Sequence, residues 1–149
     1  MTDENVLQAI PHRQPFLFVD RIVEQGEARL VTERMFRADE AFFAGHYPGS
    51  PLTPGVLLCE ACFQTGAILL MAGAAKGSGT AARSQTPMLT RIQDAKFKNS
   101  VLPGETCRVE VMLDEKMGNA YLMTGKVTSG TKKILTVQFI VALISPGKT

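Results

Sequence analysis

The longest apolar run in the chain predicts a buried helix. From Pro54 to Ala75 the sequence carries Glu60 as its only charged residue. Thr53 followed by Pro54 is typical of an N-cap and the first helical position. Because the run is apolar on nearly all sides, the rest of the protein must enclose it. A membrane span of this length would place an acidic residue near mid-bilayer at a cost of ~2.5–3.5 kcal/mol, so we expect a helix buried in protein.

Shorter patterns on either side of this run predict one helix and six strands. Residues 2–10 have helical spacing, with Thr2 or Asp3 as N-cap. Alternating or β-branched stretches separated by turn residues predict the strands. These strands are expected at 16–24, 28–38, 88–98, 105–114, 120–128 and 133–144, with a mobile surface loop at 77–87.

Two of the predicted strands carry information about their place in a sheet. The strand at 133–144 is apolar on both faces, as expected of a central strand. The strand at 28–38 has no clean apolar face, because Thr32 and Arg34 share one face with Leu30 and Phe36. The connection at 39–54 is rich in proline and glycine but also aromatic, so we expect an irregular loop that packs tightly.

Together these elements predict an α+β fold in which an antiparallel β-sheet wraps around one long buried central helix. The chain of 149 residues has the size and the 45% apolar content of a single domain, which we place at 1–149. One face of such a sheet covers the helix and the other stays open. Association through an edge or a face is therefore expected.

Charge and cysteine content limit the possible binding partners and the possible cellular compartment. Sixteen basic and fourteen acidic residues give a net charge of +2, too small and too dispersed for a nucleic-acid binder. Three cysteines form an odd set with no disulfide framework, which favours a reducing compartment. The polar, acidic start at residues 1–5 does not resemble an export signal. We expect a cytoplasmic protein.

The candidate chemistry lies in His46, within the irregular loop, and in Glu60, fourteen positions later on the apolar helix. Burial without a partner raises a carboxyl pKa above its ordinary value of about 4.3, which suits a proton donor. The ordinary pKa of histidine, about 6.5, suits the complementary base. Two other interpretations are structural: a hydrogen-bonded loop histidine, and a glutamate paired with an arginine.

Two further residues have positions that suit an active site. Gln64 follows Glu60 by one helical turn and so lies on the same face, where it can hold the carboxyl group or a bound hydroxyl. Gly55, in the first helical turn, offers an N–H group without an intrahelical acceptor, which suits an oxyanion. The alternative for Gly55 is an ordinary turn glycine.

Other candidates are weaker. Cys59-x-x-Cys62 has no second pair, so zinc or dithiol redox chemistry is a minor alternative. We interpret His12 as structural. With two histidines and few clustered carboxylates, no dedicated metal site is expected.

Three segments carry a resemblance to a known family. Residues 11–21 read PHRxPFLxVDR, residues 43–64 read FxGHYPGxPLxPGVLxxEAxxQ, and residues 95–105 read AKFKxxVxPGE. In these segments the chain resembles the β-hydroxyacyl-[acyl-carrier-protein] dehydratases of the FabZ type. The resemblance covers nearly the whole chain, although the C-terminal strands match in pattern more than in letters.

The resemblance implies a hot-dog fold and a homodimer in which His46 of one subunit faces Glu60 of the other. It implies removal of water from a β-hydroxyacyl thioester, with the acyl chain carried on the phosphopantetheine of an acyl carrier protein and no metal or redox cofactor. His46 is then the base and Glu60 the acid. Gln64 and the Gly55 N–H position the substrate and polarise the thioester oxygen. A trimer of dimers is also implied.

The sequence departs from the family pattern at Gln14, Tyr47 and Thr53, two of which flank the implied site. The preferred acyl chain length is therefore open, as is the choice between carrier-protein and coenzyme A thioesters. A thioester hydrolase of the same fold and a non-catalytic acyl-binding subunit of a synthase remain alternatives.

The loop at 77–87 is a plausible variable gate. A basic face for an acidic carrier is expected from Arg83, Arg91, Lys96, Lys98, Lys132 and Lys133.

Overall fold

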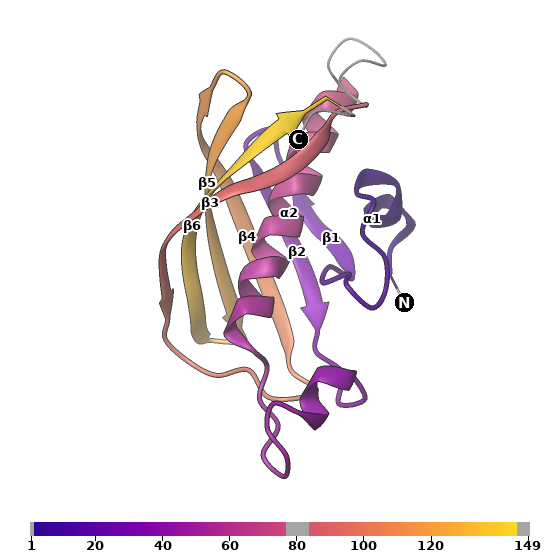
Figure 1. The fold of residues 1–149 in the computed structure, drawn as a ribbon, viewed down its shortest axis with the longest axis vertical. Coiled ribbons are helices and arrows are strands. Elements are labelled where there is room, and N and C mark those ends of the chain that lie inside the picture. The colour runs from indigo at the N-terminus through magenta and orange to yellow at the C-terminus, as the bar shows by residue number, and fades with distance from the viewer. Residues whose placement is uncertain (1, 77–83, 146–149) are drawn as a thin grey trace.

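A six-stranded antiparallel sheet wraps around one long helix in the computed structural model, which describes residues 2–76 and 84–145 (Figure 1). The order of strands across the sheet is β1-β2-β4-β5-β6-β3. The elements are α1 (Glu4–Ala9), β1 (Arg21–Gln25), β2 (Arg29–Met35), the 3-10 helix η1 (Ala41–Ala44), α2 (Gly55–Lys76), β3 (Thr86–Phe97), β4 (Thr106–Met117), β5 (Ala120–Ser129) and β6 (Lys132–Ile144). This is the predicted hot-dog arrangement, and the prediction of the fold is confirmed.

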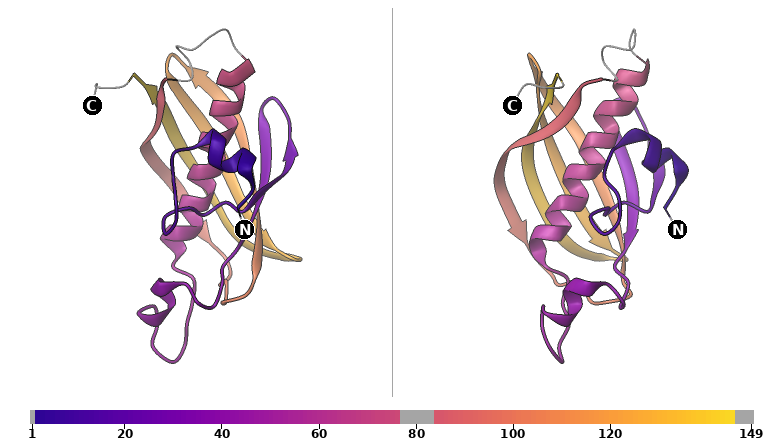
Figure 2. Two further views of the ribbon diagram at one scale, coloured as in Figure 1. Left: turned by 90° about the vertical axis from the view of Figure 1, so that its right-hand side faces the viewer. Right: turned by 45° about the vertical axis from the view of Figure 1, so that its right-hand side comes forward.

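The apolar run forms α2, as predicted, and the sheet encloses most of it. Its 19-residue stretch Gly55–Gly73 is long and apolar enough to cross a membrane, but 67% of that stretch is buried inside the protein. Helix and sheet approach closely at two glycines. A Cβ on Gly66 would lie 2.8 Å from the sulfur of Met123, and one on Gly125 would lie 2.8 Å from the sulfur of Cys62. The views in Figure 2 show the curved sheet on one side of α2 and α1 on another.

The last strand, β6, occupies the central position predicted for it, between β5 and β3. Strands β4, β5 and β6 follow one another as antiparallel hairpins, whereas β3 lies at the far edge of the sheet. The exposed side of β3 therefore leaves one row of backbone groups without a neighbouring strand in the single chain.

The strand predicted at 16–24 begins later, at Arg21, and the earlier part of that prediction is wrong. Residues 16–20 instead run across α2, and Leu17, Phe18 and Val19 are buried. The physical reason is that backbone groups of Phe16 and Phe18 bond to a side chain of α2, and the first bond to a strand is from the Asp20 N–H to the Glu33 carbonyl of β2. The N–H of Phe18 donates to Gln64 Oε1 at 2.8 Å, and the carbonyl of Phe16 accepts from Gln64 Nε2 at 3.2 Å.

The two predicted helix caps differ in outcome. Asp3 caps α1 by accepting a hydrogen bond from the N–H of Asn5, as expected. Thr53 does not cap α2, because its hydroxyl oxygen is buried without a hydrogen-bond partner. The helix begins at Gly55, and the Pro54 carbonyl accepts from the first turn instead.

The structure also differs from the sequence prediction in one strand and two loops. The strand predicted at 28–38 ends at Met35. In the loop at 39–54, η1 forms and Phe43 is buried, but Tyr47 stays half-exposed, so the loop packs tightly only in part. Most of the predicted surface loop at 77–87 lies outside the described residues, and its last two residues belong to β3.

The close approach at Gly66 makes a stability prediction with a matched control on the same helix. Gly66→Ala should lower the free energy of unfolding by ~1–3 kcal/mol, because its methyl group would overlap Met123 and the buried ring of Phe139. Gly73→Ala should raise it by ~0.5–1 kcal/mol, because nothing lies within 4 Å and alanine favours the helix. Urea denaturation measures both. Equal effects of the two changes would contradict this packing.

Candidate active site

Glu60 lies on the first half of α2 and points into a partly buried site. Its side chain is 20% exposed, and Oε1 accepts a hydrogen bond of 3.1 Å from Gln64 Nε2. Burial raises the pKa of Glu60 above its ordinary value, and the hydrogen bond from Gln64 opposes this only in part. The environment therefore favours the protonated carboxyl group, which is the form that can donate a proton.

Gln64 is held by the buried segment that precedes β1, and its orientation is fixed. Its side chain oxygen accepts from the backbone N–H of Phe18, a group that can only donate. The amide nitrogen must then face Glu60 and the Phe16 carbonyl. Gln64 is 1% exposed, so water does not compete for these bonds. The prediction that Gln64 holds the carboxyl group agrees with this geometry.

His12 is the residue that the sequence argument missed. We predicted a structural role, yet its Nε2 lies 4.0 Å from Glu60 Oε1. Burial, and to a smaller extent the neighbouring charge of Arg13, lower the pKa of His12. Its Nδ1 is buried without a hydrogen-bond partner. The acid site thus contains an imidazole with a lowered pKa beside the carboxyl group, and no pattern in the sequence links these two positions.

His46 lies two residues after the end of η1, and both its backbone and its ring form hydrogen bonds. Its backbone N–H donates to the Phe42 carbonyl at 3.0 Å, and its Nδ1 lies 2.8 Å from the Leu52 carbonyl. Because a carbonyl oxygen only accepts, Nδ1 must carry the proton in this contact. In the neutral ring, Nε2 then keeps a free lone pair and can act as a base. The ring stacks on Tyr47 with 4.2 Å between centroids.

The two predicted acid and base residues do not meet within one chain. Among the described residues, no hydrogen bond or ion pair joins His46 to Glu60, whose partners are Gln64 and His12. The single chain therefore presents two half-sites, one on the loop at 39–54 and one on α2. Their meeting across two subunits stays a prediction.

Gly55 stands in the first turn of α2, where the N–H groups have no intrahelical acceptor. A Cβ there would lie 2.8 Å from the ring of Phe97, which comes from the end of β3. No side chain therefore fits between the helix start and this ring. The structure explains why glycine is needed at this position, and the role of its N–H stays a prediction.

The cysteines are poor candidates for metal or redox chemistry. Cys59, Cys62 and Cys107 are free and buried. Burial raises the pKa of Cys59 to about 11 and that of Cys107 to about 12, and it raises the pKa of Cys62 as well. The thiols stay protonated near neutral pH and are weak nucleophiles and ligands. Within residues 2–76 and 84–145 no group of three or more His, Cys, Asp or Glu could hold a metal ion.

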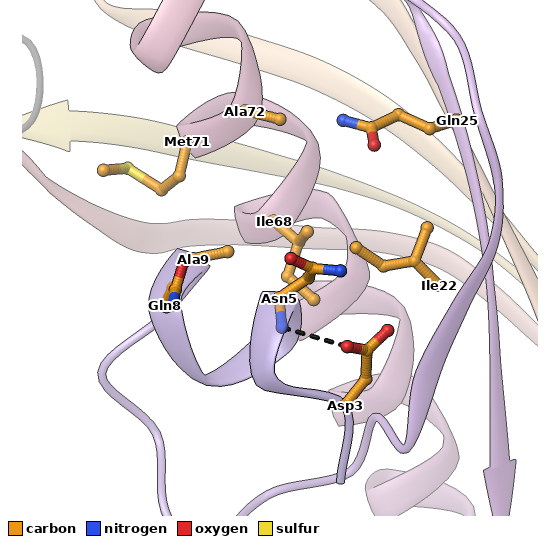
Figure 3. A pocket seen from close by; sticks show the side chains of 9 residues that line it. All are labelled: Asp3, Asn5, Gln8, Ala9, Ile22, Gln25, Ile68, Met71 and Ala72. Carbon is orange, nitrogen blue, oxygen red and sulfur yellow. Dashed lines mark hydrogen bonds between the residues drawn. The ribbon is translucent and has the colours of Figure 1, made fainter.

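A cavity of about 540 Å³ lies away from the predicted residues, between α1, β1 and the second half of α2 (Figure 3). Ile22, Ile68 and Met71 supply apolar lining, and Asp3 and Gln25 supply polar groups. None of the four predicted site residues borders it. Its mixed, open lining offers no pair of groups suited to acid and base chemistry.

Comparison with known proteins first defines the class. The fold matches the dehydratase heterocomplex ApeI:P from Xenorhabdus doucetiae with a TM-score of 0.79 at 11% identity, covering 95% of this chain and 91% of that one. It also matches a hypothetical thioesterase with coenzyme A from Streptococcus pneumoniae TIGR4, with a TM-score of 0.64 at 7% identity, covering 95% and 93%. At such identities these likenesses show the shared hot-dog fold alone.

The family follows from sequence similarity. Residues 10–138 match the model of the FabA-like domain. The chain is 35% identical over 146 residues to the 3-hydroxyacyl-[acyl-carrier-protein] dehydratase FabZ of Chloroflexus aggregans, covering 97% of both chains. It is 43% identical over 113 residues to the FabZ of Desulforamulus reducens, covering 74% and 75%. The chain belongs to the FabA-like family, and the resemblance to FabZ-type dehydratases is confirmed.

The raised pKa of Glu60 predicts a pH-dependent stability. Between the ordinary pKa of an unfolded glutamate, about 4.3, and the higher folded value, the folded state binds more protons than the unfolded state. This contribution therefore stabilises the protein at low pH and is lost as pH rises through that window. Glu60→Gln removes it, so the variant should gain stability relative to the wild type between pH 4 and neutral pH. Urea denaturation at several pH values measures the difference, and a difference constant with pH would contradict the burial of this carboxyl.

Proposed function

We propose that this chain is a 3-hydroxyacyl-[acyl-carrier-protein] dehydratase that converts β-hydroxyacyl thioesters into trans-2-enoyl thioesters during fatty acid biosynthesis. The observation that carries the proposal is the partly buried carboxyl group of Glu60, whose pKa is raised by burial and which is held by an oriented Gln64 amide. The names of its FabZ relatives support the choice of reaction.

In the proposed reaction, Nε2 of His46 removes a proton from the carbon next to the thioester carbonyl. The C–O bond to the β-hydroxyl breaks, and Glu60 transfers its proton to the departing oxygen, which leaves as water. The Gly55 N–H stabilises negative charge on the thioester oxygen as the double bond forms. Return of the proton from His46 to Glu60 restores both groups. No chemical group is required beyond these side chains and the carrier's phosphopantetheine arm.

A homodimer would bring the two half-sites together. In the single chain His46 and Glu60 are not in contact, and the edge strand β3 exposes large apolar side chains. A free apolar edge is a liability that a second copy would cover by continuing the sheet. The exposed side chains on and near this side are Met88, Leu89, Ile92 and Phe97 of β3 and Val56 at the start of α2. A trimer of dimers remains an expectation from the resemblance.

A basic groove on the sheet supports docking of an acidic carrier. Lys98, Lys126 and Lys133 line a hollow of about 230 Å³ on the sheet, and none of their side chains forms an ion pair within the described residues. Lys98 directly follows Phe97 in the sequence, and the Phe97 ring lies against Gly55 at the helix start.

The groove differs in part from the basic face expected from sequence. Lys96 and Lys132 pair with Asp94 and Glu105, which reduces their attraction for a partner. Lys126 was not predicted, and Arg83 lies outside the described residues.

The three buried free thiols fit a protein that works in the reducing cytoplasm, where we place it with its carrier.

The dimeric site makes a subunit-mixing prediction. His46→Ala and Glu60→Gln should each lower kcat by roughly 10²- to 10⁴-fold, because each removes a proton-transfer group. When the two inactive variants are unfolded, mixed equally and refolded, mixed dimers contain one intact site, so about a quarter of wild-type activity should return, as two-fold symmetry requires.

Turnover of a β-hydroxyacyl carrier-protein thioester, followed by mass spectrometry, measures this activity. A mixture that stays inactive would contradict the shared site. Release of free acid by the wild type would favour the hydrolase alternative, and binding without conversion would favour the non-catalytic subunit.

The basic groove predicts a selective loss of carrier binding. Changing Lys98, Lys126 and Lys133 together to alanine should raise KM for the carrier-protein thioester by roughly tenfold, with a weaker dependence on salt. KM for the same acyl group on coenzyme A or free pantetheine should change little. Lys116→Ala, near the end of β4 and outside the groove, is the matched control. Equal losses with carrier and small thioesters would place the carrier elsewhere.

A further inference from the structure

Arg34 is a fully buried arginine on the face of β2 that also carries Leu30 and Thr32. It is 0% exposed and lies near the end of β2, next to Phe18 and Phe36, whose ring centroids are 5.2 and 5.0 Å from its guanidinium carbon. Arginine is almost never fully buried without paired partners. Replacement of a buried ion pair by apolar residues is often neutral or stabilising, so stability alone does not explain this residue.

One branch of contacts leads from Arg34 to the loop of His46. Nη2 of Arg34 donates to Glu40 Oε2 at 2.5 Å, and Glu40 Oε1 accepts from the backbone N–H of Arg37 at 2.9 Å. Glu40 is the residue immediately before η1, and His46 lies two residues after η1 ends, with its N–H bonded to the Phe42 carbonyl. The ion pair therefore fixes the start of the short helix that places the base.

A second branch leads from Arg34 to the acid. The Phe18 ring packs on the guanidinium group, and the Phe18 N–H donates to Gln64 Oε1 at 2.8 Å. Gln64 in turn donates to Glu60 Oε1 at 3.1 Å. Asp20, two residues after Phe18, completes this branch by accepting from Arg34 Nη1 at 3.4 Å and from the N–H of Met35 at 2.7 Å. The segment that orients the Gln64 amide is thus held to the same guanidinium group.

We infer that Arg34 is a positioning residue for both halves of the site, holding the His46 loop through Glu40 and the Glu60–Gln64 pair through Phe18. This inference rests on the proposed function for its effect on turnover, but its geometry is independent of turnover. If the two half-sites of one chain serve different active sites in a dimer, Arg34 mechanically links those two sites.

The chain contains two histidines, one in each half-site, and this provides a readout that does not depend on activity. His46 reports on the base and His12, 4.0 Å from Glu60, reports on the acid. Their ring C–H signals are resolved by two-dimensional NMR of the full-length protein and are assigned with His46→Ala. If Arg34 were purely stabilising, its replacement would lower Tm without moving these signals in the folded state.

Arg34→Met should shift or broaden both histidine signals and lower kcat roughly ten- to hundredfold with little change in KM, because misplaced groups react slowly on a bound substrate. Glu40→Gln should affect the His46 signal alone, and Phe18→Leu the His12 signal alone. Arg34→Lys keeps the charge and should recover part of kcat. Arg21→Met, which removes an exposed ion pair with Glu33, is the matched control and should leave both signals unchanged.

Glu40→Gln also covers the case in which Arg34→Met fails to fold, because glutamine has nearly the same shape and still accepts from Arg37. Wild-type histidine signals in folded Arg34→Met, or in both Glu40→Gln and Phe18→Leu, would overturn the inference. An unchanged His12 signal alone would overturn the branch through Phe18. Absence of dehydratase activity in the wild type would overturn the proposed function, while the NMR comparison would still decide the positioning role.

Discussion

The hydrogen bond from the Phe18 N–H to Gln64 Oε1 is the contact on which the acid half of the site depends. It joins the buried segment before β1 to the middle of the central helix, so the packing of this segment on α2 also orients the amide. Because a backbone N–H can only donate a hydrogen bond, it must face the Gln64 oxygen, and the Gln64 nitrogen then faces Glu60. The same contact thus serves the packing of the fold and the position of the acid.

The elements that could be predicted from sequence are those whose signal is local. The helix at 55–76, the central strand at 132–144 and the chemical types of His46 and Glu60 follow from periodicity, burial and pKa arguments on neighbouring residues. Gln64 also follows, because residues four apart share a helical face.

The features that could not be predicted depend on contacts between distant parts of the chain. The segment 16–20 has the composition of a strand, but the Phe18 N–H and the Phe16 carbonyl have their partner on α2, 46 to 48 residues away. Thr53 has the right type for an N-cap, yet its hydroxyl lacks a partner in the folded chain. The roles inferred for His12 and Arg34 depend on residues that are their neighbours only in the folded chain. For Arg34, the sequence shows an arginine on an ambiguous strand face and gives no sign of the two carboxylates that flank it.

The close packing of α2 against the sheet at Gly66 and Gly125 constrains how enzymes of this kind can diversify. With side chains excluded from both glycines, the helix has no room to move toward the sheet or to carry larger residues there. A pocket for longer or bulkier acyl chains must therefore be shaped away from these two contacts, for example near the start of α2, where Val56 is exposed and the half-exposed ring of Phe97 covers Gly55. Evolution or engineering of chain-length preference would act on those positions and leave the helix and sheet unchanged.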